Sequence, residues 1–448
     1  ILKLVLCEFF VWGIIKHQKM NIVEKIIVIL FVILMLPITG TLYFSLEKNQ
    51  SLDYKLASLS KASLSNSVLS KNIENREQEA IKIDYSKKLQ NPPEVISAIY
   101  LTSWSAGSDK YVNGYLENIF KNTEINAVVI DIKDYTGYVS YNSQAEKVLK
   151  YKTSKNIIVD LSGLIKKLHE KNIYVIARLS VFEDPVLAMA RPDLAVYDLS
   201  LPLPLITRER LWKDNNGLHW IDPSSKEAWD YNISIAKDAL SRGFDEINFD
   251  YIRFPSDGKT ENMTFPYWDG VTPRHLVIKN FFERIRQELP DAKLSVDLFG
   301  QATINYDDLG IGQIIEDSFE YFDYVCPMVY PSHYAKDFMG FENPALYPYD
   351  IVKYSMESAI ERQKVYKKLL GLTEQVGNGQ EIKLAKIRPW LQDFNMGAVY
   401  TAEMVKEQIT AIKEALEENY AGYLMWNPSN VYKAEALEKE AITIVPNN

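Results

Sequence analysis

The feature that most constrains the fold is a regular alternation of strand-like and helix-like segments between residues 95 and 445. Short apolar runs of strand length are each followed by a longer segment with helical periodicity. Eight strands are predicted in this way, at 97–104, 127–133, 174–179, 246–252, 293–299, 324–330, 386–392 and 422–426. Eight strands alternating with helices predict an α/β fold, the (β/α)8 TIM barrel.

The predicted helices lie between and after these strands, at 112–121, 161–171, 226–241, 274–289, 311–322, 351–368, 402–418 and 435–442. A long insertion, 182–223, precedes the helix that leads to the fourth strand. A doubly wound open sheet would show the same alternation. The glycine-rich phosphate loop that such sheets often carry is absent from the sequence, which favours the barrel.

The segment 243–255, GFDEINFDYIRFP, is the most informative of the strands. Two apolar residues alternate with Asn248 and Asp250, which is the period-2 pattern of a strand with two different faces. In a parallel barrel one face packs beneath the helices and the other points inward. Asp250 lies near the carboxyl end, where such barrels carry their chemistry. A turn-forming role is the alternative, but Asn248, Asp250 and Arg253 together place several polar groups on an otherwise apolar run.

Polar residues recur at the ends of the other predicted strands, which a purely structural core would not require. They are Asp131, Lys133, Asp134, Arg178, Ser295, Asp297, Tyr330, His333, Arg388, Trp390, Gln392, Asp393, Trp426 and Asn427. Because the carboxyl ends of all eight strands meet at one face of a barrel, we expect these residues to surround a single cleft.

Carboxylates, aromatic rings and arginines around one cleft indicate cleavage of a glycosidic bond. One carboxyl group protonates the leaving oxygen, and a second acts as nucleophile or as base for water. The two need different environments, so that one stays protonated near neutral pH. Asp250 and Asp297, on adjacent strands, are the first catalytic pair, with Asp393 and Asp131 in reserve. Capping a turn or pairing with an arginine is the alternative for Asp297, Asp393 and Asp131.

A second group of residues is expected to contact the substrate. Its members are Asp131, Arg178, Trp220, Arg253, Tyr330, His333, Trp390 and Trp426. We expect Arg178 and Arg253 to orient a carboxylate rather than to act directly. Trp220 lies in the insertion and is either a platform for a sugar ring or part of the core.

The composition of the chain limits the kinds of ligand that the protein is expected to bind. The net charge of −9 and the pI near 5.3 argue against a nucleic-acid partner, which would favour a basic face. No Cys/His cluster has zinc-ligand spacing, so neither a metal nor another cofactor is expected. Cys7 lies in the N-terminal apolar region and Cys326 in a predicted strand, so a disulfide between them is not expected.

The N-terminal region has the pattern of a membrane anchor. Residues 1–25 are interpreted as a cytoplasmic segment or an upstream read-through, because the first methionine is Met20. Residues 26–44 carry no charge and follow several lysines, as expected for a signal-anchor that spans the bilayer. A cleaved signal peptide is the alternative, although its small-residue cleavage pattern is poor.

A polar stalk is predicted to connect this anchor to the barrel. Residues 45–94 are rich in serine and then in charged residues, a composition typical of a tether. Residues 95–445 form the predicted barrel domain. With either an anchor or a cleaved signal, the barrel is expected outside the cytoplasm.

Nine short motifs resemble a known family. They are YLTSW, VVIDIKDYTG, YVIARLSVF, WIDPSSKEAW, FDEINFDYIRFPSDG, SVDLFGQ, CPMVYPSHY, RPWLQDF and GYLMWNPSN. Spread over residues 97–435, they resemble the uncharacterised glycosyl hydrolase domain of bacterial surface proteins, a distant relative of the alpha-amylase-like TIM barrels. This resemblance implies a barrel that acts on polysaccharide. Asp250 matches the strand-4 nucleophile of alpha-amylase-like enzymes, whereas Asp297 stands where their strand-5 acid is a Glu, so the identity of the acid stays open.

The sequence therefore predicts a membrane-anchored, extracytoplasmic glycoside hydrolase with a monomeric catalytic domain and a cell-envelope or extracellular polysaccharide as substrate. A barrel that binds a glycan without turnover, through Trp220, Trp390, Trp426 and Tyr330, is the first alternative. A metal-dependent deacetylase or amidohydrolase is the second. The absence of a His-x-His motif after the first strand argues against it.

Overall fold

The computed structural model describes residues 81, 83–201, 207–374 and 383–438, which all lie in the second of two units, Ile81–Asn448. The predicted segments 1–25 and 26–44 and most of the stalk lie outside the described residues. Among the helices that the structure describes, none combines the length and the apolar character needed to cross a bilayer. Cys326 is a buried free thiol.

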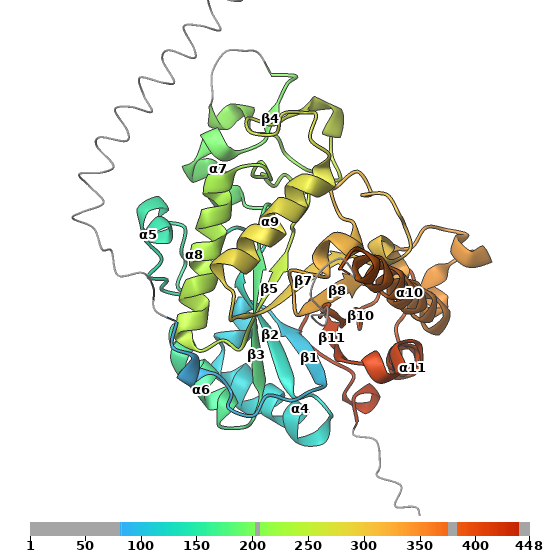
Figure 1. Ribbon diagram of the computed structural model, residues 1–448. Helices are drawn as coiled ribbons and strands as arrows, with labels where there is room; N and C mark the ends of the chain where they lie inside the picture. Colours follow the sequence, from blue (N-terminus) through green and yellow to red (C-terminus); the bar gives the residue numbers. More distant parts are fainter. Residues whose placement is uncertain (1–80, 82, 202–206, 375–382, 439–448) are drawn as a thin grey trace, which may run out of the picture. The chain divides into compact units, whose positions relative to one another are not determined.

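A closed parallel barrel forms the centre of this unit (Figure 1). Its strands are β1 (Ile96–Leu101), β2 (Ala127–Lys133), β3 (Tyr174–Ser180), β5 (Glu246–Asp250), β7 (Lys293–Phe299), β8 (Tyr324–Met328), β9 (Lys386–Ile387) with β10 (Trp390–Gln392), and β11 (Gly422–Trp426). Strand β1 pairs with both β2 and β11, and β10 pairs with both β11 and β8, which closes the ring. The predicted (β/α)8 TIM barrel is confirmed.

The seventh strand position is made of two short pieces instead of the continuous strand 386–392 that the sequence predicted. The break falls at Arg388 and Pro389. Proline has no backbone N–H and cannot donate to a strand ladder. The ladder continues on either side of it: the Arg388 N–H donates to the Val325 carbonyl at 2.9 Å, and the Pro389 carbonyl accepts from the Leu424 N–H at 2.9 Å.

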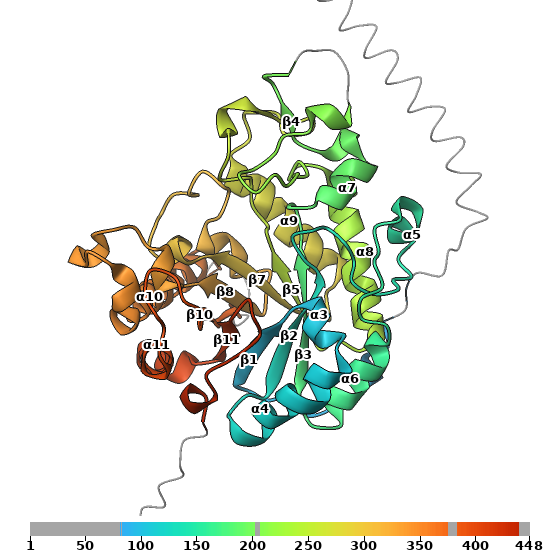
Figure 2. The same ribbon diagram turned by 180° about the vertical axis from the view of Figure 1, so that it is seen from behind.

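Helices surround the barrel, as Figure 2 shows from behind for α4, α6 and α8 beside β1, β2 and β3. The longer ones are α6 (Leu161–His169), α8 (Lys226–Arg242), α9 (Arg274–Glu288), α10 (Pro348–Glu374) and α11 (Ala402–Leu416). A π-helical turn, η2 (Tyr111–Leu116), continues into α4 (Glu117–Asn122). Short pieces complete the set: α3 (Ser103–Ala106), α5 (Glu146–Tyr151), α7 (Pro185–Ala190), β4 (Tyr197–Asp198) and β6 (Met263–Thr264).

One predicted helix is wrong, and another is described only in part. Segment 311–322 forms turns and the 3-10 turn η7 (Ile315–Ser318), because Gly310 and Gly312 adopt positive φ angles that interrupt a helix. Its buried residues Ile311, Ile315 and Phe319 have helical spacing but pack from an irregular backbone. Of segment 435–442 the structure describes residues 435–438, which include the end of the short turn η12 (Ala434–Ala436); the rest of this predicted helix lies outside the described residues.

Helix α8 and strand β5 together place the segment with Asp250. The helix begins at the N-cap Ser225, whose hydroxyl accepts from the Ala228 N–H, and it ends at Gly243 with φ +112°. Strand β5 follows directly. Ile247 and Phe249 belong to the apolar layer under the helices, whereas the alternate residues of β5 point into the barrel. The predicted two-faced strand is confirmed.

Candidate active site

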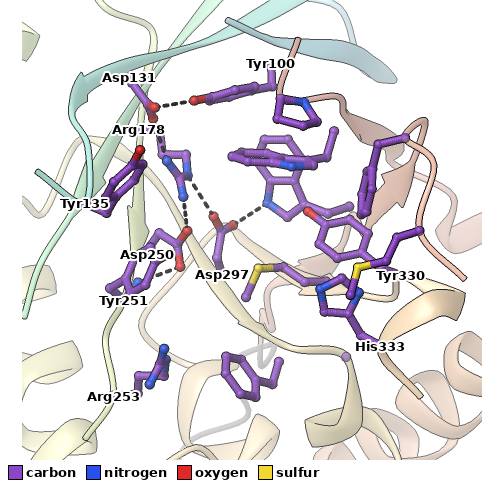
Figure 3. Close-up of a pocket in the computed structure, with 18 of the residues that line it drawn as sticks. Tyr100, Asp131, Tyr135, Arg178, Asp250, Tyr251, Arg253, Asp297, Tyr330 and His333 are labelled. Carbon is purple, nitrogen blue, oxygen red and sulfur yellow. Dashed lines mark hydrogen bonds and ion pairs between the residues drawn. The ribbon is translucent and has the colours of Figure 1, made fainter. Parts of the chain in front are cut away.

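A pocket of about 650 Å³ opens at the carboxyl ends of the barrel strands (Figure 3). Its polar lining includes Asp131, Arg178, Asp250, Arg253 and Asp297. Its aromatic lining includes Tyr100, Tyr330, Trp390, Phe394 and Trp426. A concave site with a few convergent polar groups and an apolar wall is the usual form of a small-molecule or sugar site.

Arg178, near the end of β3, contacts three carboxyl groups on the polar side of the pocket. Its Nη1 atom lies 2.6 Å from Asp131 Oδ1, its Nη2 atom forms an ion pair with Asp250 Oδ2, and its Nε atom lies 3.8 Å from Asp297 Oδ2. Tyr100 donates its hydroxyl proton to Asp131 Oδ2 at 2.5 Å. One buried guanidinium therefore contacts three carboxyl groups and fixes their relative positions (Figure 3).

Both carboxylate oxygens of Asp250 have a partner. Oδ2 pairs with Arg178, and Oδ1 accepts from the Tyr251 N–H at 2.5 Å. Tyr251 has a φ of +54°, which is uncommon for a residue other than glycine. Such backbone conformations persist where the surrounding structure imposes them, and they gather at functional sites. The turn after β5 thus aims the Asp250 carboxylate at the pocket.

Asp297 has a different environment. Its Oδ1 atom accepts from Asn248 Nδ2 at 2.8 Å and from Trp390 Nε1 at 2.7 Å. Its Oδ2 atom accepts no hydrogen bond and is sealed from bulk water. Burial, and next the negative charge of Asp250, raise the pKa of Asp297 well above its usual range. This rise favours the protonated form of Asp297, while Asp250 is ion-paired with Arg178.

Asp131 and Asp297 both have a pKa raised by burial, but their hydrogen bonding differs. Burial raises the pKa of Asp131, but Arg178 and the Tyr100 hydroxyl both donate to its oxygens and oppose that rise. Its position between two donors suits a role in orienting Arg178. Asp250 and Asp297 are thus the two carboxyl groups of the pocket whose surroundings differ most.

The opposite wall of the pocket is aromatic. Tyr100 and Trp426 stack with ring centroids 4.0 Å apart, and Trp390 meets Trp426 edge-on at 5.6 Å. Tyr330 packs against Phe394 at 5.5 Å. Such rings offer apolar faces to the C–H side of a sugar.

His333 lies beside this wall and lines the pocket. Its ring packs against Tyr330 with centroids 5.3 Å apart, and its Nδ1 atom lies 3.0 Å from the Ser332 hydroxyl. Burial lowers the pKa of His333, which favours the neutral imidazole.

Two predicted site residues do not line the pocket. Asp393 is buried against Lys433, whose ammonium group and backbone N–H both contact its carboxylate, so it fixes the C-terminal segment. The prediction that Asp393 lies with the catalytic residues is wrong, because its side chain does not line the pocket. Trp220 is buried outside the pocket lining and donates its Nε1–H to Asp214 at 3.0 Å, so it does not serve as a sugar platform in this pocket.

Several other polar residues at predicted strand ends also lie away from the pocket lining. Arg388 forms a fully buried ion pair with Glu246 inside the barrel. Lys133 forms another with Asp184 at 2.7 Å. The side chains of Asp134, Ser295, Gln392 and Asn427 are likewise outside the lining. The expectation that every one of these residues surrounds a single cleft is therefore wrong.

Some residues of the site were missed from the sequence. Tyr100 occupies an inward position of β1, and the alternation of that strand was a usable signal. Tyr251, Phe299 and Tyr135 line the pocket without a sequence signal that separates them from ordinary core or surface aromatics. Glu183 approaches the site through a β-bridge with Trp220, a contact across the insertion that spacing does not reveal.

The described residues contain no group of three or more His, Cys, Asp or Glu side chains arranged to hold a metal ion. The three pocket carboxylates instead converge on the guanidinium of Arg178.

A parallel barrel with a carboxyl pair at the ends of adjacent strands has the architecture of a glycoside hydrolase domain. The sequence model of the family described as "Putative glycosyl hydrolase domain" matches residues 98–432. The chain belongs to this family, which confirms the resemblance seen in its motifs. No curated protein matches the sequence.

Solved structures that are similar to parts of the chain include the following two. A hypothetical protein from Ruminiclostridium thermocellum ATCC 27405 is 41% identical over 44% of this chain and 96% of its own, with a TM-score of 0.40. The PgaB (BpsB) glycoside hydrolase domain from Bordetella bronchiseptica is 15% identical over 78% of this chain and 100% of its own, with a TM-score of 0.51. The second match shows that the two share a fold.

Proposed function

We propose that this protein hydrolyses glycosidic bonds of a cell-envelope or extracellular polysaccharide, with Asp250 and Asp297 as the catalytic pair. One observation carries the proposal: two carboxyl groups on adjacent strands share a pocket but have opposite environments. Asp250 is ion-paired with Arg178, whereas burial and the charge of Asp250 raise the pKa of Asp297 and favour its protonated form. This division is what an acid and its ionised partner need.

The roles follow from the contacts. Asp297 gives its proton to the leaving glycosidic oxygen, and Asp250 acts as nucleophile or as base for water. Once Asp297 has lost its proton, the hydrogen bonds from Asn248 and Trp390 and the nearby Arg178 stabilise its negative charge. The aromatic wall holds the sugar beside the pair.

The location is part of the proposal. The uncharged segment 26–44 anchors the chain in the membrane, and the polar residues 45–94 carry the barrel domain away from it. Recovery of the full chain in the membrane fraction, with the barrel accessible to external protease, checks this arrangement.

Release of reducing ends from a panel of bacterial envelope glycans tests the activity. We expect the full chain to cleave at least one glycan and Asp250→Asn to lower the rate about a thousandfold or more, because single nucleophilic or acid/base groups have effects of that order. Asp393→Asn is the matched control, since Asp393 is a buried, ion-paired aspartate outside the pocket lining. That variant should keep the rate within about threefold and lose some stability.

Other results would assign another function. Cleavage that survives Asp250→Asn would place the chemistry on different carboxyl groups. A chain that binds a glycan without releasing reducing ends would be a binding module, and an activity abolished by chelators would indicate a metal-dependent hydrolase.

A further inference from the structure

Arg253 is a buried cation that lines the pocket without an ion-pair partner. It follows strand β5 by three residues and is 8% exposed. Among the described residues, no carboxylate oxygen lies within 4.0 Å of its side-chain nitrogens, whereas Arg178 contacts three carboxyl groups. Leaving a buried charge unpaired is costly, so its retention calls for an explanation.

The side chain of Arg253 is fixed in place. Its guanidinium carbon lies 4.6 Å from the ring centre of Trp220, 4.9 Å from that of Phe299 and 5.4 Å from that of Tyr251. Its Nη1 atom donates to the Phe254 carbonyl at 3.2 Å and to the Ser256 hydroxyl at 3.0 Å. Trp220, which does not reach the pocket itself, therefore supports the arginine from behind.

Two donors of Arg253 remain for a ligand. Within the described part of the chain, its Nε and Nη2 atoms donate to no protein atom, and neither is sealed from solvent. In Figure 3 the guanidinium lies beyond the Tyr251 ring from the Asp131–Arg178–Asp250 group, and no dashed line reaches it. A planar guanidinium with two free donors on a rigid support is suited to a carboxylate or a phosphate.

The surrounding charges leave the arginine positive. Asp250 already engages Arg178 and the Tyr251 N–H with its two oxygens. Glu183 and Asp257 are the other nearby carboxyl groups, and neither forms an ion pair with Arg253; burial raises the pKa of Glu183 to about 8, so it is neutral at pH 7. The pocket therefore holds one local positive charge that no residue neutralises by contact.

We propose that the glycan bound in this pocket carries an anionic substituent, a carboxylate or a phosphate, and that Arg253 binds it. This inference rests on the proposed function and adds the class of substrate. The net charge of −9 does not attract a polyanion from a distance. Because exposed charges are screened beyond about 8 Å at physiological ionic strength, recognition by one buried cation is sufficient at contact.

Binding of the full chain to an immobilised glycan panel tests the proposal. The panel holds carboxylated polysaccharides with their carboxyl-reduced forms, phosphate-substituted glycans with their dephosphorylated forms, and neutral glycans. Binding is measured in an Asp297→Asn background, because Asn replaces the neutral form of Asp297 without changing the charge around Arg178. Asp250→Asn would instead free Arg178 to bind anions.

We expect the chain to bind at least one anionic glycan about tenfold or more tightly than its neutralised form, and Arg253→Gln to remove that preference. Arg253→Lys should keep part of it. Loss of binding on carboxyl reduction assigns the carboxylate, and loss on dephosphorylation assigns the phosphate. Arg274→Gln is the matched control: Arg274 also stacks on two aromatic rings, Phe254 and Trp268, but lies outside the pocket lining.

A preference for neutral glycans, binding to no anionic glycan of the panel, or an anionic preference that survives Arg253→Gln would overturn the proposal. If Arg253→Gln does not fold, the comparison of each glycan with its neutralised form still decides the matter with Arg253 intact. Asp250-dependent cleavage of neutral glycans without anionic preference would contradict this inference alone. Anionic preference without release of reducing ends would contradict the hydrolase proposal alone.

Discussion

At the scale of single residues, burial and the charge of Asp250 raise the pKa of Asp297, and two hydrogen bonds oppose that rise without cancelling it. Both donors that reach it, from Asn248 and Trp390, go to Oδ1. Oδ2 has no hydrogen-bond donor to stabilise a negative charge. A second donor at Oδ2 would have favoured the ionised form instead. Burial in the barrel interior therefore outweighs the two hydrogen bonds and favours the acid form of Asp297.

Glu183 gives a prediction for stability against pH. Its pKa rises from 4.5 to about 8 on folding, mainly through burial, so the folded state holds a proton that the unfolded state releases. The associated stability is complete below about pH 4.5 and is lost as the pH rises through 8, by up to about 1.4 kcal/mol for each pH unit. We expect Glu183→Gln to reduce the fall in unfolding free energy between pH 5 and pH 8.

Urea unfolding of the full chain and of Glu183→Gln at pH 5 and pH 8 measures this effect. Asp297 and Asp131 contribute to the pH dependence of both proteins, so only the difference between the two slopes counts. Equal slopes would show that Glu183 is ionised in the folded protein at neutral pH, and that Arg253 has an ionised neighbour.

At the scale of elements, closure of the barrel depends on the start of β11. Gly422 has a φ of +94°, and a Cβ atom there would overlap the Ile96 carbonyl oxygen of β1. We expect Gly422→Ala to lower the unfolding free energy by about 3 kcal/mol or more, since it combines backbone strain with a clash.

Gly371→Ala is the control for this prediction. Gly371 lies in α10, and a Cβ there meets no atom within 4 Å. Alanine in a helix interior should raise the unfolding free energy by about 0.5–1 kcal/mol. Chemical denaturation of both variants checks the pair. A neutral Gly422→Ala would mean that the β1–β11 junction is less tightly packed than its geometry indicates.

The elements themselves were largely predictable from the sequence. The bounds of β2, β7 and β11 agree with their apolar runs, because polar or turn residues mark both ends. Segment 311–322 shows the limit of periodicity. The spacing of Ile311, Ile315 and Phe319 records that they are buried, but two glycines with positive φ decide that the backbone there is not helical.

At the scale of the whole molecule, a line of polar contacts runs along the inward face of β5, beside the apolar cluster that other strands contribute to the barrel interior. Glu246 pairs with Arg388 and accepts from Ser295, and one register further along Asn248 contacts Asp297. Alternation along β5 predicts that these residues face inward, but it does not give their depth. For the same reason, the sequence indicated which strands carry polar residues, but it did not show which of those residues lie deep in the barrel and which line the pocket.

The contents of the site were less predictable than the fold. Asp250 and Asp297 could be predicted as pocket residues because each lies on a strand with a clear alternating pattern, near the end where such barrels carry their sites. Asp393 lies just beyond a strand end, where the loop turns its carboxylate toward Lys433. Trp220, in the insertion, packs against the guanidinium of Arg253, which follows β5. Neither contact is local, and sequence spacing does not encode it.

The central claim is that Asp297 and Asp250 divide the work of acid and ionised partner. The most direct test compares two substrates of the same sugar, once the panel has identified it: the natural glycan and an aryl glycoside whose leaving group needs no proton. We predict that Asp297→Asn slows cleavage of the glycan about a thousandfold but that of the aryl glycoside less than about tenfold, whereas Asp250→Asn slows both. Equal losses on both substrates for Asp297→Asn, or rapid aryl glycoside cleavage by Asp250→Asn, would contradict the assignment.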